Sequence, residues 1–330
     1  MEIAFSDSVA VKDATSVSEA RRMALLAAQR LDFDEERAGE VALLATEASR
    51  NVLIHGGGGQ VIVMGIRDGD QTVTRILAMD KGPGIANIAQ AFTDGYSTAG
   101  TMGGGMGAIK RMATTLEVFT GRSGTILMLE VGHATLPGPL RIAGIALPYP
   151  GERLCGDGWT VHHTPERMSI LLVDGLGHGR EAAEATQEAI AAFRARAHLP
   201  PGEILGYLHD ALRKTRGAVA GIAEIRPDKS LLTYAGVGNI AAAVVAGDIS
   251  RSLISHNGTL GMAMSRVQEF TMPWSSNSLL VMHSDGLQSR WDLSSYAGLT
   301  ARHPAVIGGA LLRDFRRQRD DASVVVVKAA

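Results

Sequence analysis

The sequence predicts an α+β protein of two domains, an α/β sandwich followed by a β-sandwich flanked by helices. Three observations support this prediction. The chain has 330 residues, which is about right for two average domains. Its first part combines helical runs with pairs of strand-like runs, whereas its second part is mostly strand-like. Between them, residues 133–140 contain two prolines and little periodicity, which predicts a linker between domains at residues 1–132 and 141–330.

The first domain opens with two helical runs and continues with strands. Ser16 and Glu19 form an S-x-x-E pattern that predicts the cap of the first helix. Asp32 and Glu35 are expected to cap the second. The expected helices are residues 16–31, 35–54 and 106–113, and the expected strands are residues 61–66, 72–79, 116–120 and 125–131. This order predicts antiparallel strands with helices on one face.

The second domain is rich in strands, with a pair of helices inserted after the third. The expected strands are residues 141–147, 159–163, 168–173, 219–225, 230–235, 240–246, 267–272, 278–282 and 323–327. The expected helices are residues 180–195, 202–213 and 305–316. This pattern predicts two packed sheets flanked by helices.

Composition excludes several classes of protein. The formal net charge is −2, so no bulk attraction to nucleic acid or an anionic membrane is expected. The N-terminus shows no signal-peptide pattern, and no run reaches the length of a membrane span. The only cysteine, Cys155, fits a reducing compartment, so we expect a cytoplasmic protein. Cys155 itself is expected to be a buried strand residue rather than a nucleophile.

Three stretches of the first domain suit a nucleotide. Glu47 and Asn51 are four residues apart on a predicted helix and so share a face, where a carboxylate can accept a proton and an amide oxygen can ligate Mg²⁺. Asp80 follows an apolar strand and can accept a hydrogen bond from an adenine amino group, while the glycines at 82 and 84 let the backbone bend around the base. The glycine cluster at 103–107 precedes a helix, where N–H groups and the helix dipole suit phosphate.

These stretches, in this order and followed by Gly124 and Thr125, resemble the ATP site of the GHKL superfamily, the Bergerat fold. The resemblance covers roughly residues 1–132 and is strongest to the RsbT/RsbW group of kinases. It implies that Glu47 activates a substrate serine, Asn51 holds Mg²⁺, Asp80 reads adenine and Thr125 lies near the base. It assigns the remaining ATP contacts to Gly82 and Gly84 in the base pocket and to Gly103, Gly105 and Gly107 in a phosphate lid.

Four acidic positions of the second domain lie beside strand-like runs. They are Asp157, Asp174, Asp285 and Asp320, the first three each followed by glycine and the last followed by Asp321. Carboxylates gathered at one sheet edge repel each other unless a cation lies between them. Hard oxygen ligands suit Mg²⁺ or Mn²⁺, and two such ions can bind a phosphoryl group and activate water. The pattern therefore predicts a site for phosphate-ester hydrolysis.

The motifs Asp174-Gly-Leu-Gly-His-Gly179, Ser284-Asp-Gly286 and the terminal Asp-Asp-Ala-Ser323 resemble the SpoIIE/RsbX branch of metal-dependent protein phosphatases. The resemblance covers roughly residues 141–330 and implies a fold of the PPM type. It implies that two Mn²⁺ or Mg²⁺ ions are held by Asp157, Asp174, the Gly175 carbonyl, Asp285 and Asp320. Asp321 is left unassigned, His178 is expected to pack or position water near the metals, and the stretch 234–239 is expected to be structural.

The two resemblances together imply a bifunctional regulator of a bacterial partner-switching, stressosome-like pathway. The kinase half would phosphorylate a serine or threonine of STAS-domain proteins, such as RsbS/RsbR-like antagonists, and the phosphatase half would remove such phosphates. A downstream regulator or sigma-factor pathway component is a further expected partner. The alternative is an ATP-binding anti-sigma or nucleotide-sensing module that regulates a phosphatase without phosphoryl transfer.

Overall fold

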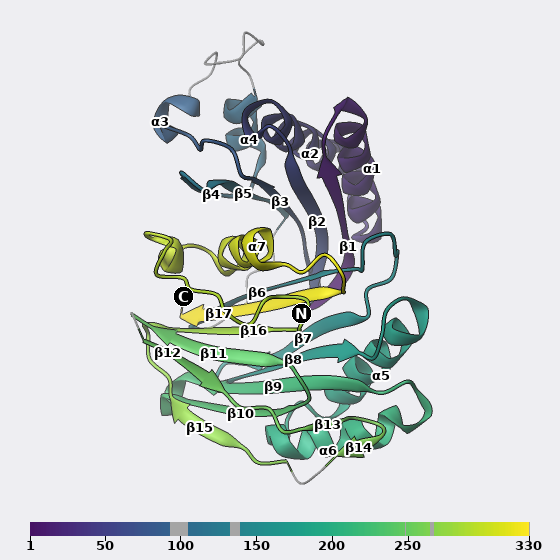
Figure 1. Cartoon of the computed structure of the whole chain (residues 1–330). Coiled ribbons are helices and arrows are strands. Elements are labelled where there is room, and N and C mark those ends of the chain that lie inside the picture. Colours follow the sequence, from purple (N-terminus) through teal and green to yellow (C-terminus); the bar gives the residue numbers. More distant parts are fainter. Residues whose placement is uncertain (93–104, 133–138, 248, 265–266, 330) are drawn as a thin grey trace. The chain divides into compact units, whose positions relative to one another are not determined.

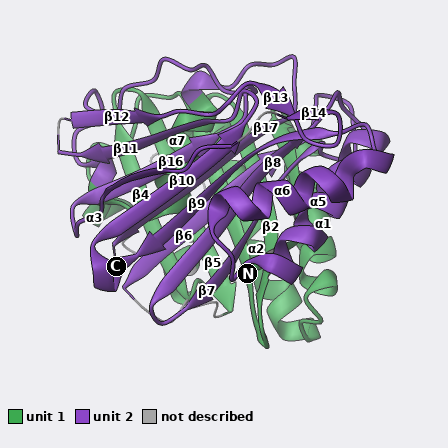
Figure 2. Cartoon of the chain, turned by 90° about the horizontal axis from the view of Figure 1, so that it is seen from below, with its two compact units in different colours: residues 1–135, 301–313 green, residues 136–300, 314–330 purple. Residues whose placement is uncertain are grey.

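The computed structural model describes residues 1–92, 105–132, 139–247, 249–264 and 267–329. The chain divides into two compact units, drawn in green and purple in Figure 2. Unit 1 comprises residues 1–135 and 301–313, and unit 2 comprises residues 136–300 and 314–330. The segment 301–313, expected within the second domain from sequence, therefore belongs to the first unit by its contacts. None of the helices in the described ranges is both long and apolar enough to cross a membrane.

Unit 1 is an antiparallel sheet with its two long helices on one face, as the sequence predicts (Figure 1). Its strands are β1 (Glu2–Val11), β2 (Gly59–Asp68), β3 (Gln71–Asp80), β4 (Thr115–Gly121) and β5 (Gly124–Gly132), in the order β1-β2-β3-β5-β4. Its helices are α1 (Ala14–Arg30), α2 (Glu35–Gly56), α3 (Ile88–Ala91) and α4 (Gly105–Met112). The edge strand β1 was not predicted, because only its pairing with β2 reveals it as part of the sheet.

Both long helices of unit 1 begin at residues other than those predicted. Asp13 caps α1: its side chain accepts from the Ser16 N–H at 2.9 Å, and the Ser16 hydroxyl accepts from the Asp13 N–H at 3.0 Å. Asp34 caps α2 through its side chain alone, which accepts from the Arg37 N–H at 2.8 Å. The caps predicted at Ser16 and Asp32 are therefore wrong. At each helix start, a different aspartate supplies the carboxylate that satisfies the free N–H groups.

Each face of the unit 1 sheet is buried. Helices α1, α2 and α4 pack on the face that carries Val61, Val63 and the other side chains of one apolar cluster. Because side chains alternate along a strand, Ile62, Met64 and their neighbours lie on the opposite face, and they too are almost fully buried. Helix α7 (Pro304–Phe315) contacts this second face through Gly309. A helix distant in sequence thus completes the unit.

The contact of α7 with the sheet leaves little room for a side chain at position 309. A Cβ atom there would lie 3.2 Å from the Met79 sulfur and 3.6 Å from the Ile126 Cγ2 atom. We expect Gly309→Leu to lower the free energy of unfolding by about 2 kcal/mol, because an enlarged side chain forces the helix from the sheet. Urea titration of the full chain measures this. The control Gly39→Leu, on an open face of α2 with nothing within 4 Å, should be neutral or stabilising.

Unit 2 is a sandwich of two five-stranded antiparallel sheets flanked by helices, again as predicted (Figure 1). One sheet has the order β15-β10-β9-β8-β7 and the other β12-β11-β16-β17-β6. The strands are β6 (Leu140–Leu147), β7 (Asp157–Thr164), β8 (Arg167–Gly175), β9 (Ala218–Arg226), β10 (Leu231–Val237), β11 (Ala241–Ala246), β12 (Ile249–Leu253), β15 (Phe270–Pro273), β16 (Ser278–His283) and β17 (Ala322–Ala329), with a small pair β13 (Gly258–Thr259) and β14 (Ala263–Met264).

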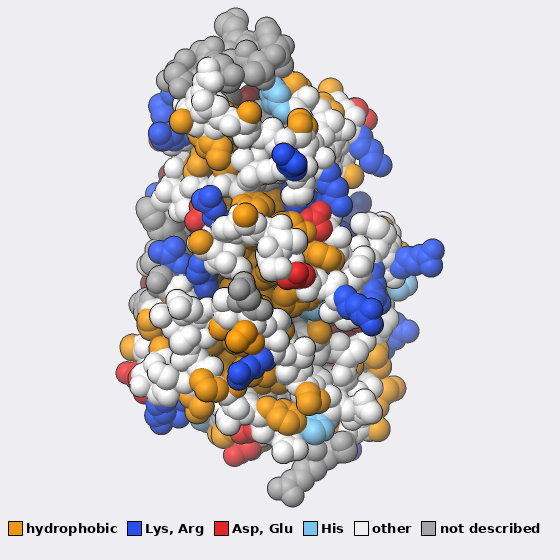
Figure 3. Space-filling view, turned by 60° about the vertical axis from the view of Figure 1, so that its left-hand side comes forward, with side chains coloured by type: hydrophobic (Ala, Val, Ile, Leu, Met, Phe, Trp, Pro, Cys, Tyr) orange, Lys and Arg blue, Asp and Glu red, His pale blue; other side chains and the backbone are white. Residues whose placement is uncertain are grey.

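Helices α5 (Arg180–Arg196) and α6 (Pro201–Ala211) cover the sheet that contains β8 and β9. Leu171 and Ile222 of these strands belong to the same buried apolar cluster as Phe193 and Leu205 of the helices. This packing fixes the end of β8, where the chain turns into α5. On the face drawn in Figure 3, basic and acidic side chains are scattered among apolar and neutral ones, in keeping with the small net charge.

Candidate functional site

The acidic positions of unit 2 converge although they are far apart in sequence. Asp157 begins β7 and lies directly opposite Asp174 near the end of β8. Asp285 follows β16, and Asp320 precedes β17, the neighbouring strand of the other sheet. Antiparallel pairing thus brings a strand start, two strand ends and a loop to one edge of the sandwich. The prediction that these side chains come together depended on this pairing, which the strand pattern alone does not specify.

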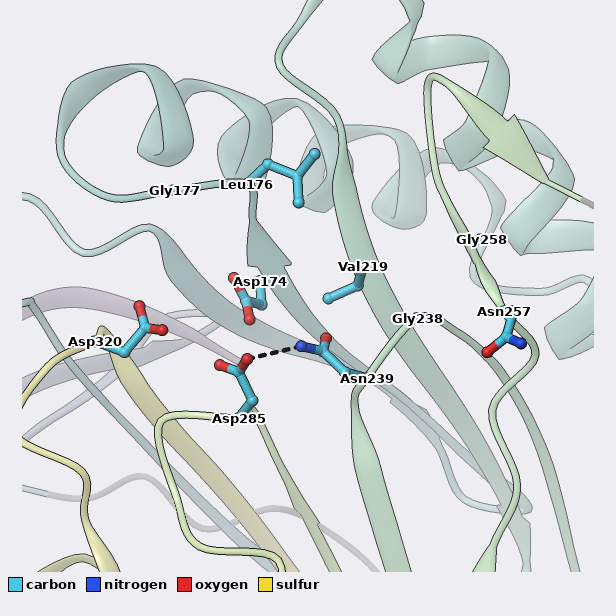
Figure 4. A pocket seen from close by; sticks show the side chains of 10 residues that line it. All are labelled: Asp174, Leu176, Gly177, Val219, Gly238, Asn239, Asn257, Gly258, Asp285 and Asp320. Carbon is cyan, nitrogen blue, oxygen red and sulfur yellow. Dashed lines mark hydrogen bonds between the residues drawn. The ribbon is translucent and has the colours of Figure 1, made fainter.

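Three of these carboxylates line a pocket of about 410 Å³ (Figure 4). They are Asp174, Asp285 and Asp320, and Figure 4 shows their side chains extending into the same space. The wall is completed by Leu176, Gly177, Val219, Gly238, Asn239, Asn257 and Gly258. Sequence reasoning did not identify these wall residues as part of the site. Leu176 and Gly177 lie within the Asp174–Gly179 motif, and Asn239 ends the stretch 234–239 that was expected to be structural, but no role at the site was predicted for any of them.

Asp157 lies buried next to this pocket. Its side chain is 4% exposed, and its Oδ2 atom accepts a hydrogen bond from the Ser284 hydroxyl at 2.6 Å. The Ser284 hydroxyl in turn accepts from the Ser323 N–H at 3.0 Å, so that β17 and the loop after β16 hold the carboxylate together. The Oδ1 atom of Asp157 has no hydrogen-bond partner among the described residues. A buried oxygen of this kind is costly unless it receives a donor or a cation.

Burial and mutual repulsion disturb the ionisation of these groups. Burial, followed by the nearby charges of Asp157, Asp285 and Asp320, raises the pKa of Asp174 far above its ordinary value. Burial also raises the pKa of Asp157, despite its hydrogen bond from Ser284. The pKa of Asp285 is raised by burial and then by Asp320. In a metal-free site, each carboxylate therefore makes it harder for the next to ionise.

The donor set fits a divalent cation. All four side chains offer hard oxygen ligands, which suit Mg²⁺ or Mn²⁺. The orphaned Asp157 oxygen and the mutually raised pKa values are what carboxylates show when a compensating charge is missing. Among the described residues, no group of three or more His, Cys, Asp or Glu side chains is arranged so that it could hold a metal ion without further movement.

The neighbours of the aspartates have structural contacts. The Asp321 side chain accepts from the Tyr149 N–H at 2.8 Å and is 2% exposed, so it ties the loop after β6 to β17, while Asp320 faces the pocket. Cys155 precedes β7 and is only partly exposed, so the prediction of a buried strand residue is wrong. Loss of solvent around its sulfur still raises the pKa of the thiol well above its usual range, which disfavours a thiolate nucleophile. His178 stacks on Tyr149, with ring centroids 4.5 Å apart, and its Nδ1 lies 3.2 Å from Glu152.

Gly175, expected to offer its carbonyl to a metal, ends β8 immediately after Asp174. A Cβ atom at this position would lie 2.3 Å from the Ala182 carbonyl oxygen, so only glycine allows α5 to approach the strand this closely. The Gly175 N–H donates to the Gly156 carbonyl at 3.0 Å. These contacts hold the backbone around Asp157 and Asp174 in place, and the role of the Gly175 carbonyl stays a prediction.

Without metal, the buried carboxyl of Asp174 should destabilise the folded chain. Burial costs free energy because the unfolded chain keeps this group ionised in water. In EDTA, Asp174→Asn is expected to raise the free energy of unfolding by roughly 1–3 kcal/mol. Added Mn²⁺ should raise the unfolding temperature of the natural chain but not that of the variant. Calorimetry with and without Mn²⁺ checks this, with Asp228→Asn, on an exposed turn, as the neutral control.

In unit 1, Asp80 is the most firmly held of the expected nucleotide residues. It ends β3 and is 8% exposed. Its Oδ1 atom accepts from the Gly82 N–H at 2.8 Å and from the Thr125 N–H at 3.1 Å. A Cβ atom on Gly82 would lie 2.8 Å from the Gly56 Cα atom, so the backbone is tightly packed here. Asp80, Gly82 and Thr125 therefore come together as one group.

The backbone around Asp80, Gly82 and Thr125 is also tightly packed. Gly84 has φ +79°, a left-handed conformation, and a Cβ atom there would lie 2.4 Å from the Gly121 carbonyl oxygen. The Thr120 hydroxyl lies 3.0 Å from the Thr125 hydroxyl and accepts from the Ile85 N–H at 2.8 Å. Thr120 was not singled out from sequence, because a threonine in a strand carries no signal of its own.

Glu47 and Asn51 lie on α2, one turn apart, as predicted. The Glu47 side chain is 20% exposed and lies 3.5 Å from the Arg50 guanidinium. The Asn51 amide donates to the Met106 sulfur of α4 at 3.1 Å. Two glycines expected in the phosphate lid, Gly105 and Gly107, lie at the start of α4, and the third, Gly103, lies outside the described residues. Asn51 thus borders the helix that carries the glycines.

Each of the two domains of the chain is similar to known proteins. The family model for Stage II sporulation protein E (SpoIIE) matches residues 164–330, half of the chain, and that for the histidine kinase-like ATPase domain matches residues 10–131. The chain is 31% identical over 93 residues to the serine/threonine-protein kinase RsbT of Bacillus subtilis (strain 168), covering 28% of this chain and 70% of RsbT. It is 24% identical over 139 residues to the phosphoserine phosphatase RsbX of the same organism, covering 42% of this chain and 69% of RsbX.

Solved structures are similar as well. One similar structure comes from work on the bacterial stressosome as a modular system adapted to control secondary messenger signaling. It is 27% identical to this chain, with a TM-score of 0.53, and the match covers 57% of this chain and 99% of that structure. RsbX in complex with magnesium shares 20% identity with a TM-score of 0.53, over 66% of this chain and all of its own. The latter supports the fold alone. The predicted resemblances and the fold class are thereby confirmed.

Proposed function

Because the chain belongs to the SpoIIE family and carries an ATPase domain homologous to RsbT, we propose that it both adds and removes phosphate in a partner-switching pathway. Unit 2 is a metal-dependent phosphatase domain, and its proposed substrate is phosphoserine or phosphothreonine of a STAS-domain protein. The observation that carries this proposal is the pocket where Asp174, Asp285 and Asp320 meet beside buried Asp157.

The phosphatase chemistry follows from the acidic pocket. Two Mg²⁺ or Mn²⁺ ions held there would supply positive charge for the phosphoryl oxygens and a water of lowered pKa. The chain's own contribution is to hold Asp157, Asp174, Asp285 and Asp320 at one edge of the sandwich. Ser284 fixes Asp157, and α5 and the Gly175 backbone fix Asp174. The open pocket leaves space for a phosphorylated side chain beside the carboxylates.

The proposed kinase site consists of residues of α2, β3, β5 and α4. Asp80, held by two N–H donors, would accept from the adenine amino group, with Gly82, Gly84 and Thr125 around the base. Asn51 would hold Mg²⁺, and Gly103, Gly105 and Gly107 would cover the phosphates. Glu47 would take the proton of the attacking serine or threonine hydroxyl, so that transfer depends mainly on positioning.

The proposed partners are STAS-domain proteins of the RsbS/RsbR kind, in the cytoplasm. The homology to RsbT and the similarity to a chain studied with the bacterial stressosome support this assignment. The test is a two-step assay with a purified STAS protein: transfer of radiolabel from ATP in Mg²⁺, then release of labelled phosphate after ATP is removed and Mn²⁺ is added. Failure of the first step excludes the kinase with that partner, and failure of the second excludes the phosphatase.

One observation favours a second function, in which unit 1 senses nucleotide and regulates the phosphatase. Arg313 of α7 donates to the Asp80 backbone carbonyl at 3.3 Å, beside the proposed adenine contact. The chain then continues through residues 314–319 to Asp320 of the acidic pocket. Sensing requires that ATP changes the phosphatase rate of the natural chain and that Arg313→Ala removes this change. A rate that does not respond to ATP excludes sensing.

A further inference from the structure

We propose that Asn239 is a positioning residue that holds the Asp285 carboxylate in the orientation required to bind a metal ion. The proposal rests on the proposed phosphatase function of unit 2. The Asn239 Nδ2 atom donates to the Asp285 Oδ2 atom at 2.7 Å, the bond drawn as a dashed line in Figure 4. Both side chains line the acidic pocket: Asn239 lies in the connection that crosses from β10 of one sheet to β11 of the other, and Asp285 follows β16, the strand paired with β11.

The backbone before Asn239 adopts a conformation that requires glycine at position 238. Gly238 has φ +91°, in the left-handed region, and a Cβ atom there would lie 2.1 Å from the Val219 Cγ1 atom. The Gly238 N–H donates to the His256 carbonyl at 2.8 Å, which joins this turn to the segment that carries Asn257. Only glycine allows this path, and the path directs the next side chain toward Asp285.

A buried polar chain supports the turn from its other side. The Tyr234 side chain is fully buried, and its hydroxyl lies 2.9 Å from that of Ser255. The Ser255 hydroxyl also donates to the Ile240 carbonyl at 2.8 Å, immediately after Asn239. The stretch 234–239 was expected to be structural, and these bonds are structural. Their effect is to present Asn239 to the acidic pocket.

The bond to Asn239 matters because Asp285 faces other carboxylates. It shares the pocket with Asp174 and Asp320, and without a fixed partner its side chain is free to rotate away from them. A neutral amide donor opposes this rotation without adding a positive charge that would compete with a cation. It engages Oδ2 and leaves Oδ1 available as a ligand. Partners that orient metal-binding side chains in this way contribute about 10–100-fold in metal affinity.

The test measures Mn²⁺ binding to the full chain by isothermal titration calorimetry. We expect Asn239→Ala and Asn239→Ser, whose side chains cannot reach Asp285, to weaken Mn²⁺ binding by about 10-fold or more. The control is Asn277→Ala, an exposed asparagine in the turn before β16 that does not line the acidic pocket. It should retain the natural affinity within about 2-fold. A merely structural role would lower the unfolding temperature and leave the affinity unchanged, which would overturn the proposal.

Activity provides the second readout. At saturating Mn²⁺, both Asn239 variants should regain nearly the natural kcat with an unchanged KM for the phosphorylated protein, because Asn239 acts through Asp285. A lasting loss of kcat or an increase in KM would instead make Asn239 a substrate contact and overturn the positioning role. Asp285→Ala distinguishes a failure of the metal site from a failure of the role of Asn239. If it leaves Mn²⁺ affinity unchanged, the metal site itself is wrong; if it weakens binding while the Asn239 variants do not, only this inference fails.

Discussion

Replacement of Asp174 by asparagine is expected to lower Mn²⁺-dependent phosphate release by at least about 100-fold. Asp174 lines the acidic pocket at the end of β8 and is surrounded by Asp157, Asp285 and Asp320. The amide is nearly the same size but carries no charge, so it cannot balance a divalent cation at the centre of this group. Phosphate release from a phosphorylated STAS protein, measured over a range of Mn²⁺ concentrations, checks the loss.

The matched control for this variant is Asp228→Asn, on an exposed turn of the same unit, which should release phosphate at the natural rate. The Asp174→Asn chain should also keep its kinase activity, because the proposed kinase residues all belong to unit 1. Undiminished turnover by Asp174→Asn would show that the acidic pocket is not the hydrolytic site. Loss of both activities would indicate damage to the fold rather than to the site.

Replacement of Glu47 by alanine is expected to reduce phosphoryl transfer by about 10²–10⁴-fold while ATP binding stays nearly unchanged. Glu47 lies on α2 one turn before Asn51, and its carboxylate is partly open to solvent, where a substrate hydroxyl can reach it. In the proposed site, ATP binding depends instead on the group around Asp80, which Glu47 does not touch in the bonds described. Radiolabel transfer and equilibrium binding of a fluorescent ATP analogue separate these effects.

Two further variants distinguish a loss of catalysis from a loss of ATP binding. Glu19→Ala removes an exposed glutamate of α1 and should change neither measurement. Asp80→Asn should weaken ATP binding itself, because the adenine contact is altered while the fold keeps a side chain of similar size. Transfer by Glu47→Ala at the natural rate would remove Glu47 from the role of base. Equal loss of binding in the Glu47 and Asp80 variants would mean that both serve the nucleotide.

Much of the fold follows from patterns that are local in the sequence. Runs of helical and strand periodicity predicted the helices of both units and most of the long strands. The caps were misplaced, because several acidic residues compete for the same free N–H groups at each helix start. The edge strand β1 escaped prediction because its identity depends on pairing with β2. Helix α7 was predicted as a helix, but an apolar helix does not specify which sheet it will cover.

The sequence by itself determined the types of residue available for chemistry: aspartates at strand ends, a Glu-x-x-x-Asn helix and glycine-rich turns. Their chemistry favours hard cations and phosphates as ligands, because the donor and acceptor atoms of a side chain do not depend on the fold, whereas its ionisation does. Only the tertiary structure decided that Asp285 receives a hydrogen bond from Asn239, that Asp320 rather than Asp321 faces the pocket, and that α7 completes unit 1. Those outcomes depend on strand register and on packing between distant segments, which no local pattern encodes.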